Sequence, residues 1–145
     1  MGKQVLCGGT TNALSTTTEQ RVPFWGLGIC KSTGDEYAVP APTSLTVRNL
    51  RVDLLVAPGT GDSRTFTVLK NGSATGVTVT IAGAGTTAID TSNDFTCVAG
   101  DYISIASTLS GSPDASRVLV SLEIETDDAD ESILFGWIDP NTASN

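Results

Sequence analysis

The amino-acid sequence predicts an all-β protein that folds as a single antiparallel β-sandwich of the jelly-roll kind. Composition is the first observation, because the 145 residues include 21 Thr, 14 Ser and 15 Gly but only three Lys. Thr and Val suit a pleated, half-buried strand, whereas Gly and Ser favour turns. The second and third observations are apolar residues that alternate with polar ones, and turn residues that recur about every ten positions. A chain of this length can bury one core without metal or disulfide staples.

Residues 24–31 and 45–56 are the first two predicted strands. In the second strand the apolar residues change from odd to even positions: Leu45 and Val47, then Leu50, Val52, Leu54 and Val56. One inserted residue explains this change of parity. We therefore expect a β-bulge near Arg48-Asn49 that keeps both halves of the strand facing the core.

Residues 64–70 and 75–82 are predicted to pair as a hairpin around Asn71-Gly72. This dipeptide is the preferred pair for a two-residue turn in which both residues have positive φ. Such a loop gives the register Lys70 with Ser73, Val68 with Thr75 and Phe66 with Val77. Directly opposed residues share a face, so the apolar side chains of both strands should point into one core.

Four further strands complete the predicted set. Residues 94–98 and 102–108 are joined by a tight turn at Ala99-Gly100-Asp101, and Ile103 and Ile105 should face inward. The clearest alternation covers residues 117–125, and an apolar segment follows at residues 133–138. We expect residues 1–23 to be an N-terminal extension, residues 24–125 to be the β-sandwich domain, and residues 126–145 to be an acidic spacer and C-terminal arm.

The charge balance argues against nucleic acid as a partner. The formal net charge is −8, and no cluster of Lys and Arg offsets it locally. The apolar runs are far shorter than the roughly 20 residues that cross a bilayer, so no membrane partner is expected. The first residues lack the apolar stretch of a secretory signal, which predicts synthesis in a cytosol. Cys7, Cys30 and Cys97 have no metal-type spacing, and we expect buried, reduced thiols, with a Cys7–Cys30 bridge as the alternative.

Catalytic chemistry has little support in the sequence. The chain contains no histidine, which removes the commonest general base and metal ligand. The remaining carboxylate candidates are Asp35 with Glu36 and the acidic run at residues 127–131. The run lacks the pattern of a calcium loop, and we interpret it as a solvated linker in preference to a cation site or a catalytic site. We expect a protein that is not an enzyme and that needs no cofactor or metal.

Two tryptophan segments stand near the ends of the chain, and both could contact a partner. Phe24 and Trp25 form the first, and Ile133, Phe135 and Trp137 share one face of the second. One interpretation makes each segment an edge strand of the chain's own core. A second places both segments against a neighbouring subunit, because aromatic residues are enriched at interface cores. A third is a stacking platform for a sugar.

An ordered set of motifs carries a family resemblance over residues 24–125. The set is Phe24-Trp25-Gly26, Leu45-Thr46-Val47 to Leu50-Arg51-Val52, Phe66-Thr67-Val68-Leu69-Lys70-Asn71-Gly72, Val77-Thr78-Val79-Thr80-Ile81, Val98-Ala99-Gly100-Asp101-Tyr102-Ile103 and Val120-Ser121-Leu122-Glu123-Ile124. In this layout the chain resembles the small β-sandwich proteins carried on the virions of tailed phages. The Val-Ala-Gly-Asp-x-Ile turn is also similar to a turn in trimeric jelly rolls of the complement and tumour-necrosis-factor type.

This resemblance implies a non-enzymatic structural protein on the surface of a phage virion, made in the host cytoplasm. The expected role is capsid decoration, with a homo-oligomer, most simply a homotrimer, that binds the major capsid protein or another virion protein. A receptor-binding or carbohydrate-binding fibre module is the first alternative, in which case a glycan is the ligand. An extracellular filament subunit is the second. Residues 1–23 and 126–145 lie outside the resemblance.

Overall fold

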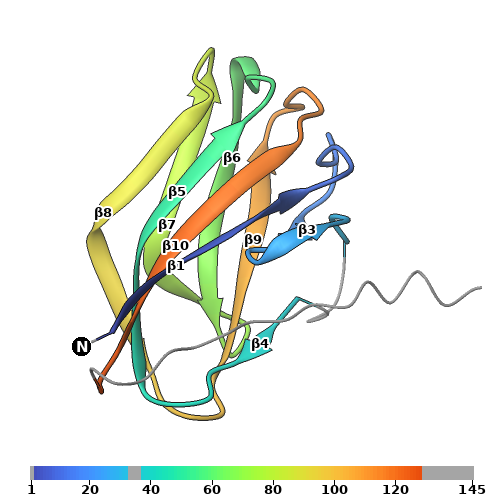
Figure 1. The fold of residues 1–145 in the computed structure, drawn as a ribbon. Coiled ribbons are helices and arrows are strands. Elements are labelled where there is room, and N and C mark those ends of the chain that lie inside the picture. The colour runs from blue at the N-terminus through green and yellow to red at the C-terminus, as the bar shows by residue number, and fades with distance from the viewer. Residues whose placement is uncertain (1, 33–36, 129–145) are drawn as a thin grey trace, which may run out of the picture.

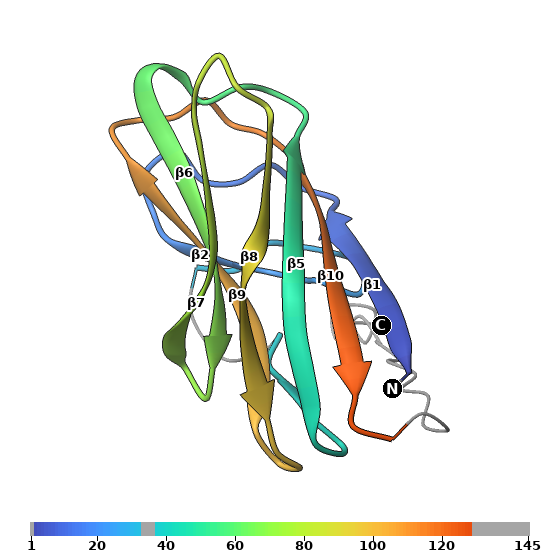
Figure 2. The same ribbon diagram turned by 90° about the vertical axis from the view of Figure 1, so that its left-hand side faces the viewer.

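The computed structural model describes residues 2–32 and 37–128, which form two β-sheets packed face to face (Figures 1 and 2). No helix occurs among these residues. The strands are β1 (Lys3–Thr10), β2 (Gln20–Val22), β3 (Gly26–Gly28), β4 (Val39–Pro40), β5 (Leu45–Leu54), β6 (Gly59–Lys70), β7 (Ser73–Gly83), β8 (Thr87–Cys97), β9 (Tyr102–Ser110) and β10 (Val118–Thr126).

The order of the strands confirms the predicted sandwich and its jelly-roll arrangement. Sheet A has the order β3-β1-β10-β5-β8, and sheet B has the order β2-β9-β6-β7 with β4 also paired to β9. Each strand is followed by one in the other sheet, except in the β6–β7 hairpin, and the first long strand lies beside the last, as in a jelly roll. All pairs are antiparallel except β1 with β3, which run parallel over three residues.

A single core fills the space between the sheets. The predicted alternation in the last strand is confirmed, since Val118, Val120, Leu122 and Ile124 are buried while Leu119 is half exposed. Ile103 and Ile105 on β9 face inward as expected. On β6, Phe66 and Val68 are also fully buried, and so is the ring of Phe24. The period-two pattern therefore identifies the core face correctly on the strands that it predicts.

The predicted β-bulge in β5 is also confirmed. Asn49 has φ 55°, and the pairing of β5 shifts at this residue against both of its neighbours, β10 and β8. An Asn tolerates this left-handed conformation better than most residues. The extra residue restores the parity of the strand, so that Leu45 and Val47 before the bulge and Leu50 and Val52 after it are all buried.

The Asn71-Gly72 turn is confirmed, but the register beyond it is not the predicted one. Lys70 pairs with Ser73 as expected, whereas Phe66 pairs with Val79 and not with Val77. A bulge between these points adds two residues to β7, and the hydroxyl of Thr75 donates to the carbonyl of Val68 at 2.7 Å in the gap. A shift of two residues preserves the face, so the same apolar side chains still point inward.

The N-terminal boundary of the sandwich needs correction. Residues 1–23 were expected to be an extension, but β1 pairs with β10 over seven residues and β2 pairs with β9. Gly8 permits this arrangement, because a Cβ on it would lie 2.4 Å from the backbone of Phe24. The sequence of β1 gives little indication of a strand, because Leu6 is the one large apolar side chain on its inward face. The sandwich therefore begins at β1.

Arg64 is an unexpected member of the core. Its side chain is 1% exposed, and one guanidinium nitrogen donates to the carbonyl groups of Pro113 and Asp114 at 3.3 and 2.9 Å. Burial lowers the pKa of this guanidinium. Backbone carbonyl groups, which carry partial negative charge, hold the guanidinium in place and tie the loop between β9 and β10 to sheet B.

The turn between β6 and β7 gives a direct test of the hairpin. Gly72 has φ 77°, and a Cβ at this position would meet open space, so strain is the principal cost of a substitution. Replacing Gly72 with Val should lower the free energy of unfolding by about 1 kcal/mol or more, because a β-branched residue is strained at positive φ. Gly72→Asn is the matched control and should cost much less. Urea denaturation of the unaltered protein and the two variants measures the difference. Equal stabilities for the Val and Asn variants would contradict the explanation by backbone strain.

Candidate interaction surface

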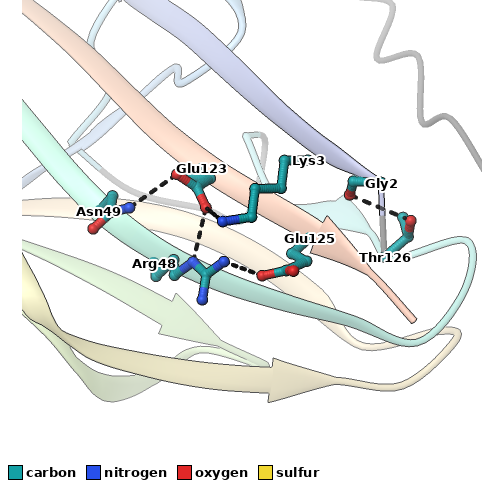
Figure 3. Close-up of polar contacts among 7 residues, drawn as sticks. All are labelled: Gly2, Lys3, Arg48, Asn49, Glu123, Glu125 and Thr126. Atoms are coloured by element: carbon teal, nitrogen blue, oxygen red, sulfur yellow. Dashed lines mark hydrogen bonds and ion pairs between the residues drawn. The ribbon is translucent and has the colours of Figure 1, made fainter. Parts of the chain in front are cut away.

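The outer face of sheet A carries a cluster of paired charges at the β5 bulge (Figure 3). We call Lys3, Arg48, Asn49, Glu123 and Glu125 the charge cluster. They come from β1, β5 and β10, three neighbouring strands of the sheet. The bulge allows both Arg48 and Asn49 to reach the same carboxylate on β10, although they are adjacent in the chain.

Glu123 is the centre of the charge cluster. It accepts hydrogen bonds from Nε of Arg48 at 2.8 Å and from Nδ2 of Asn49 at 2.9 Å, and Nζ of Lys3 lies 3.6 Å away. The second arm of Arg48 pairs with Glu125. Glu125 is 8% exposed despite its outward position. The cluster therefore ties β1, β10 and β5 together from outside the core.

The hydrogen bonds of the charge cluster favour the ionised forms of Glu123 and Arg48. The hydrogen bond from Arg48, then that from Asn49, lowers the pKa of Glu123, while partial burial opposes the shift. The same bond raises the pKa of Arg48. A carboxylate whose folded pKa is depressed stabilises the fold at pH values above its unfolded pKa. That contribution is lost as the pH falls through the folded pKa.

Apolar side chains gather on the same face, at the end nearest β3. We call Val5, Cys7, Leu27 and Leu119 the apolar strip. Val5 is 66% exposed, Leu27 59% and Leu119 50%. Gly9 pairs with both Leu27 and Leu119, and a Cβ on it would lie 2.8 Å from the Leu119 side chain. The missing side chain of Gly9 thus lets Leu119 lie over β1.

A shallow hollow borders the apolar strip on its β5 side. Leu119 and Ser121 of β10 form one part of its lining, and Arg51 and Asp53 of β5 form another. Its volume is about 270 Å³. Arg51 donates to Asp53 at 2.9 Å, and this bond contributes most to the lowered pKa of Asp53. The hollow therefore combines an apolar wall with a fixed ion pair.

The structure corrects the expectation that Phe24 and Trp25 contact a neighbouring subunit. Phe24 is 0% exposed and Trp25 is 8% exposed in the single chain, with their rings edge to face at 4.3 Å. They therefore belong to the chain's own core, which also removes Trp25 as a sugar-stacking platform. The predicted strand at residues 24–31 is reduced to β3, Gly26–Gly28. Ile133, Phe135 and Trp137 lie outside the described residues.

The cysteines and carboxylates fall in separate places. Cys30 and Cys97 are buried as predicted, and burial raises the pKa of the Cys97 thiol to about 11. Cys7 is exposed, which corrects the prediction for that residue, and all three thiols are free. Of the acidic candidates, Asp127 and Asp128 are exposed, while Asp35, Glu36 and residues 129–131 lie outside the described part of the chain. Within residues 2–32 and 37–128, no group of three potential ligands could hold a metal ion.

A second cluster, which the sequence did not reveal, joins two turns at one end of the sandwich. The Asn71 side chain accepts from the backbone N–H of Tyr102 at 2.7 Å and donates to Asp101 at 2.7 Å. The N–H of Val98, the Asn71 side chain and Lys70 together lower the pKa of Asp101 to about 2. Tyr102 is half exposed beside a hollow of about 400 Å³. The sequence predicts the turns at Asn71-Gly72 and Ala99-Gly100-Asp101, but it does not indicate that the Asn71 side chain links them.

Comparisons with known proteins do not identify a family for this chain. The chain matches no family model and no curated protein sequence. The described part of the chain also contains no helix that is long and apolar enough to cross a membrane.

The geometry of the charge cluster predicts that the pKa of Glu123 depends on Arg48. Replacing Arg48 with Met removes both of its ion pairs and keeps most of its length, so the pKa of Glu123 should rise towards the usual value for a glutamate. Carbon-13 NMR titration of the Glu side-chain carboxyl groups measures this pKa. Arg51→Met, which removes an ion pair elsewhere on the same strand, is the control and should leave Glu123 unchanged. An unchanged Glu123 in the Arg48 variant would contradict the arrangement in Figure 3.

Proposed function

We propose that this protein is a non-enzymatic structural component of a phage virion, and that it decorates the surface of the capsid as a homo-oligomer, most simply a homotrimer. The apolar strip on sheet A is the observation that carries the proposal. Exposed apolar side chains gathered on a flat sheet, beside charges that are already paired, suit a protein partner. The jelly-roll order of strands adds to the resemblance to phage virion proteins.

The electrostatics favour a protein partner over nucleic acid. The chain carries 16 acidic and eight basic residues, and Arg48 and Arg51 on this face are both engaged with carboxylates. A phosphate backbone would meet a surface of net negative charge. The major capsid protein, or another protein of the particle, is the proposed partner of the apolar strip. The absence of histidine from the sequence supports a role without catalysis.

Particle binding tests this proposal. Particles assembled without the chain should lack a regular surface density in electron microscopy and should regain it when the purified protein is added. Leu119→Asp, in the apolar strip, should weaken that binding at least tenfold, since loss of a central apolar contact costs about 1.4 kcal/mol or more. Ile89→Asp is the matched control, because Ile89 is 53% exposed on β8, at the other edge of the same sheet. Binding that is equally weakened by both, or absent altogether, would count against the proposal.

A glycan-binding fibre module is the second candidate, and Tyr102 is the observation that favours it. It is an exposed aromatic residue beside the hollow that Ala38, Asn71 and Gly72 also line. An exposed aromatic face beside a hollow is suited to stacking of a sugar ring. Specific glycan binding that is lost in Tyr102→Ala, together with absence from the capsid, would favour this candidate over decoration.

A further inference from the structure

The outer faces of the two sheets carry different side chains. On sheet A the apolar strip is accompanied by Leu55, which is 59% exposed just after β5, and by Ile89 on β8, so this face holds most of the large apolar side chains that are exposed in the described part of the chain. The outer face of sheet B instead carries paired hydroxyl groups, as between Thr65 and Thr80 at 2.8 Å. Covering the face of sheet A therefore removes more apolar surface from water and fewer polar groups.

Arg117 adds a cation to one end of this face. It precedes β10 and is exposed, whereas Val118 is buried and Leu119 is exposed again. This alternation places Arg117 and Leu119 on the same face, about 7 Å apart along the strand. Figure 1 shows that β10 starts at the end of the sheet opposite the N-terminus. Arg117 therefore lies at the other end of β10 from the charge cluster.

Leu55 lies beside Arg117 on the neighbouring strand. Val118 pairs with Leu54, and the N–H of Leu55 donates to the carbonyl of Arg117 at 3.1 Å. Residues opposed in this way share a face and have Cβ atoms about 5 Å apart. Two exposed leucines thus flank Arg117, with Leu119 along its own strand and Leu55 across from it.

Arg117 differs from the other cations of this face in its lack of a carboxylate partner. Lys3, Arg48 and Arg51 each form an ion pair with a carboxylate of the same sheet. Within residues 2–32 and 37–128, Arg117 forms no ion pair. A paired cation offers a partner little net attraction, because a new carboxylate would only replace the existing one. Among the described cations of this face, Arg117 is therefore the one that can bind an acidic group of a partner.

The surroundings of Arg117 specify the group that it would bind. A guanidinium presents a planar fork of N–H donors that matches a carboxylate in two parallel hydrogen bonds. A partner that covers Leu55 and Leu119 also removes water from around Arg117. Loss of water strengthens a charge-assisted hydrogen bond but penalises a cation that is left unpaired. A partner that covers these leucines therefore needs an acidic group at this point.

We propose that the partner of the apolar strip binds Arg117 through an Asp or Glu side chain, and that an apolar side chain of the same segment packs on Leu119 about 7 Å away. This inference rests on the proposed function, because it states the chemistry of the particle protein that the apolar strip contacts. The complementarity is local, since the net charge of the chain is −8 and gives no long-range attraction to an acidic protein. Arg117 thus fixes the register of the contact once the apolar surfaces meet.

Particle binding by variants at residue 117 is the first test. Arg117→Gln should weaken binding to the particles about tenfold or more, because the partner carboxylate is then buried without a cation. Arg117→Lys should retain more of the affinity, since it keeps the charge and loses only the planar fork. Thr108→Glu, at an exposed position of β9 in sheet B, is the control for net charge, because it too makes the chain one unit more negative. Circular dichroism and urea denaturation compare the folding of the three variants with that of the unaltered protein.

Zero-length cross-linking identifies the acidic group directly. Arg117→Lys places a primary amine at this position, and a water-soluble carbodiimide joins an amine to a carboxylate as an amide only when the two are in contact. Mass spectrometry of the variant bound to particles should find residue 117 joined to an Asp or Glu of a particle protein. Ile89→Lys places the same amine at the other edge of the same face and is the matched control, which should give much less of such a product.

The outcomes separate this inference from the proposed function. Particles that bind Arg117→Gln as tightly as the unaltered protein would overturn the inference and leave the proposed function standing. Bound Arg117→Lys without a cross-link at residue 117 above the Ile89→Lys level would do the same. Equal weakening by Arg117→Gln and Thr108→Glu would assign the effect to net charge and also overturn the inference. Particles that do not bind the unaltered protein would contradict the proposed function, and this inference with it.

Discussion

The bulge in β5 is the constraint on which the rest of the structure depends. A one-residue change of register moves every following side chain to the other face of a sheet. Without the extra residue at Asn49, the residues Leu50, Val52 and Leu54 would face outward, and burial of each is worth about 1.5–3 kcal/mol. The cost of one Asn at φ 55° is small by comparison. Burial therefore decides the backbone geometry, and the charge cluster follows from it, because the bulge brings Arg48 and Asn49 to one carboxylate.

Two kinds of polar burial support the sandwich, and they differ in how they are compensated. Glu123 on the outer face has a full cation beside it, and its lowered pKa indicates that pairing outweighs the cost of partial desolvation. Arg64 in the core has carbonyl groups as its acceptors, and its pKa is lowered because burial dominates. The first arrangement therefore weakens in acid as Glu123 is protonated. The second involves no group that titrates in that range, and it fixes the loop between β9 and β10.

The sequence predicted the features that depend on local signals. Alternation located the core face of β10, a change of parity located the bulge, and Asn71-Gly72 located the turn. The predictions were wrong or incomplete where a contact joins residues that are far apart in the sequence. β1 was missed because Gly8 and Gly9 give no apolar alternation, although their small size is what permits close contact with Phe24 and Leu119. The charge cluster was missed because Arg48 and Glu123 are 75 residues apart, and strand register cannot be read from either segment alone.

The apolar strip and the charge cluster both lie where β1 meets β10. The core is closed on the β8 side by contact with β7, whereas the β1 side carries both of these features. Both lie on the outer face of sheet A, and Val5 of the apolar strip pairs directly with Glu123 of the charge cluster. Since Lys3, Val5 and Cys7 alternate along β1, the pairing of β1 with β10 fixes the apolar strip and the charge cluster together.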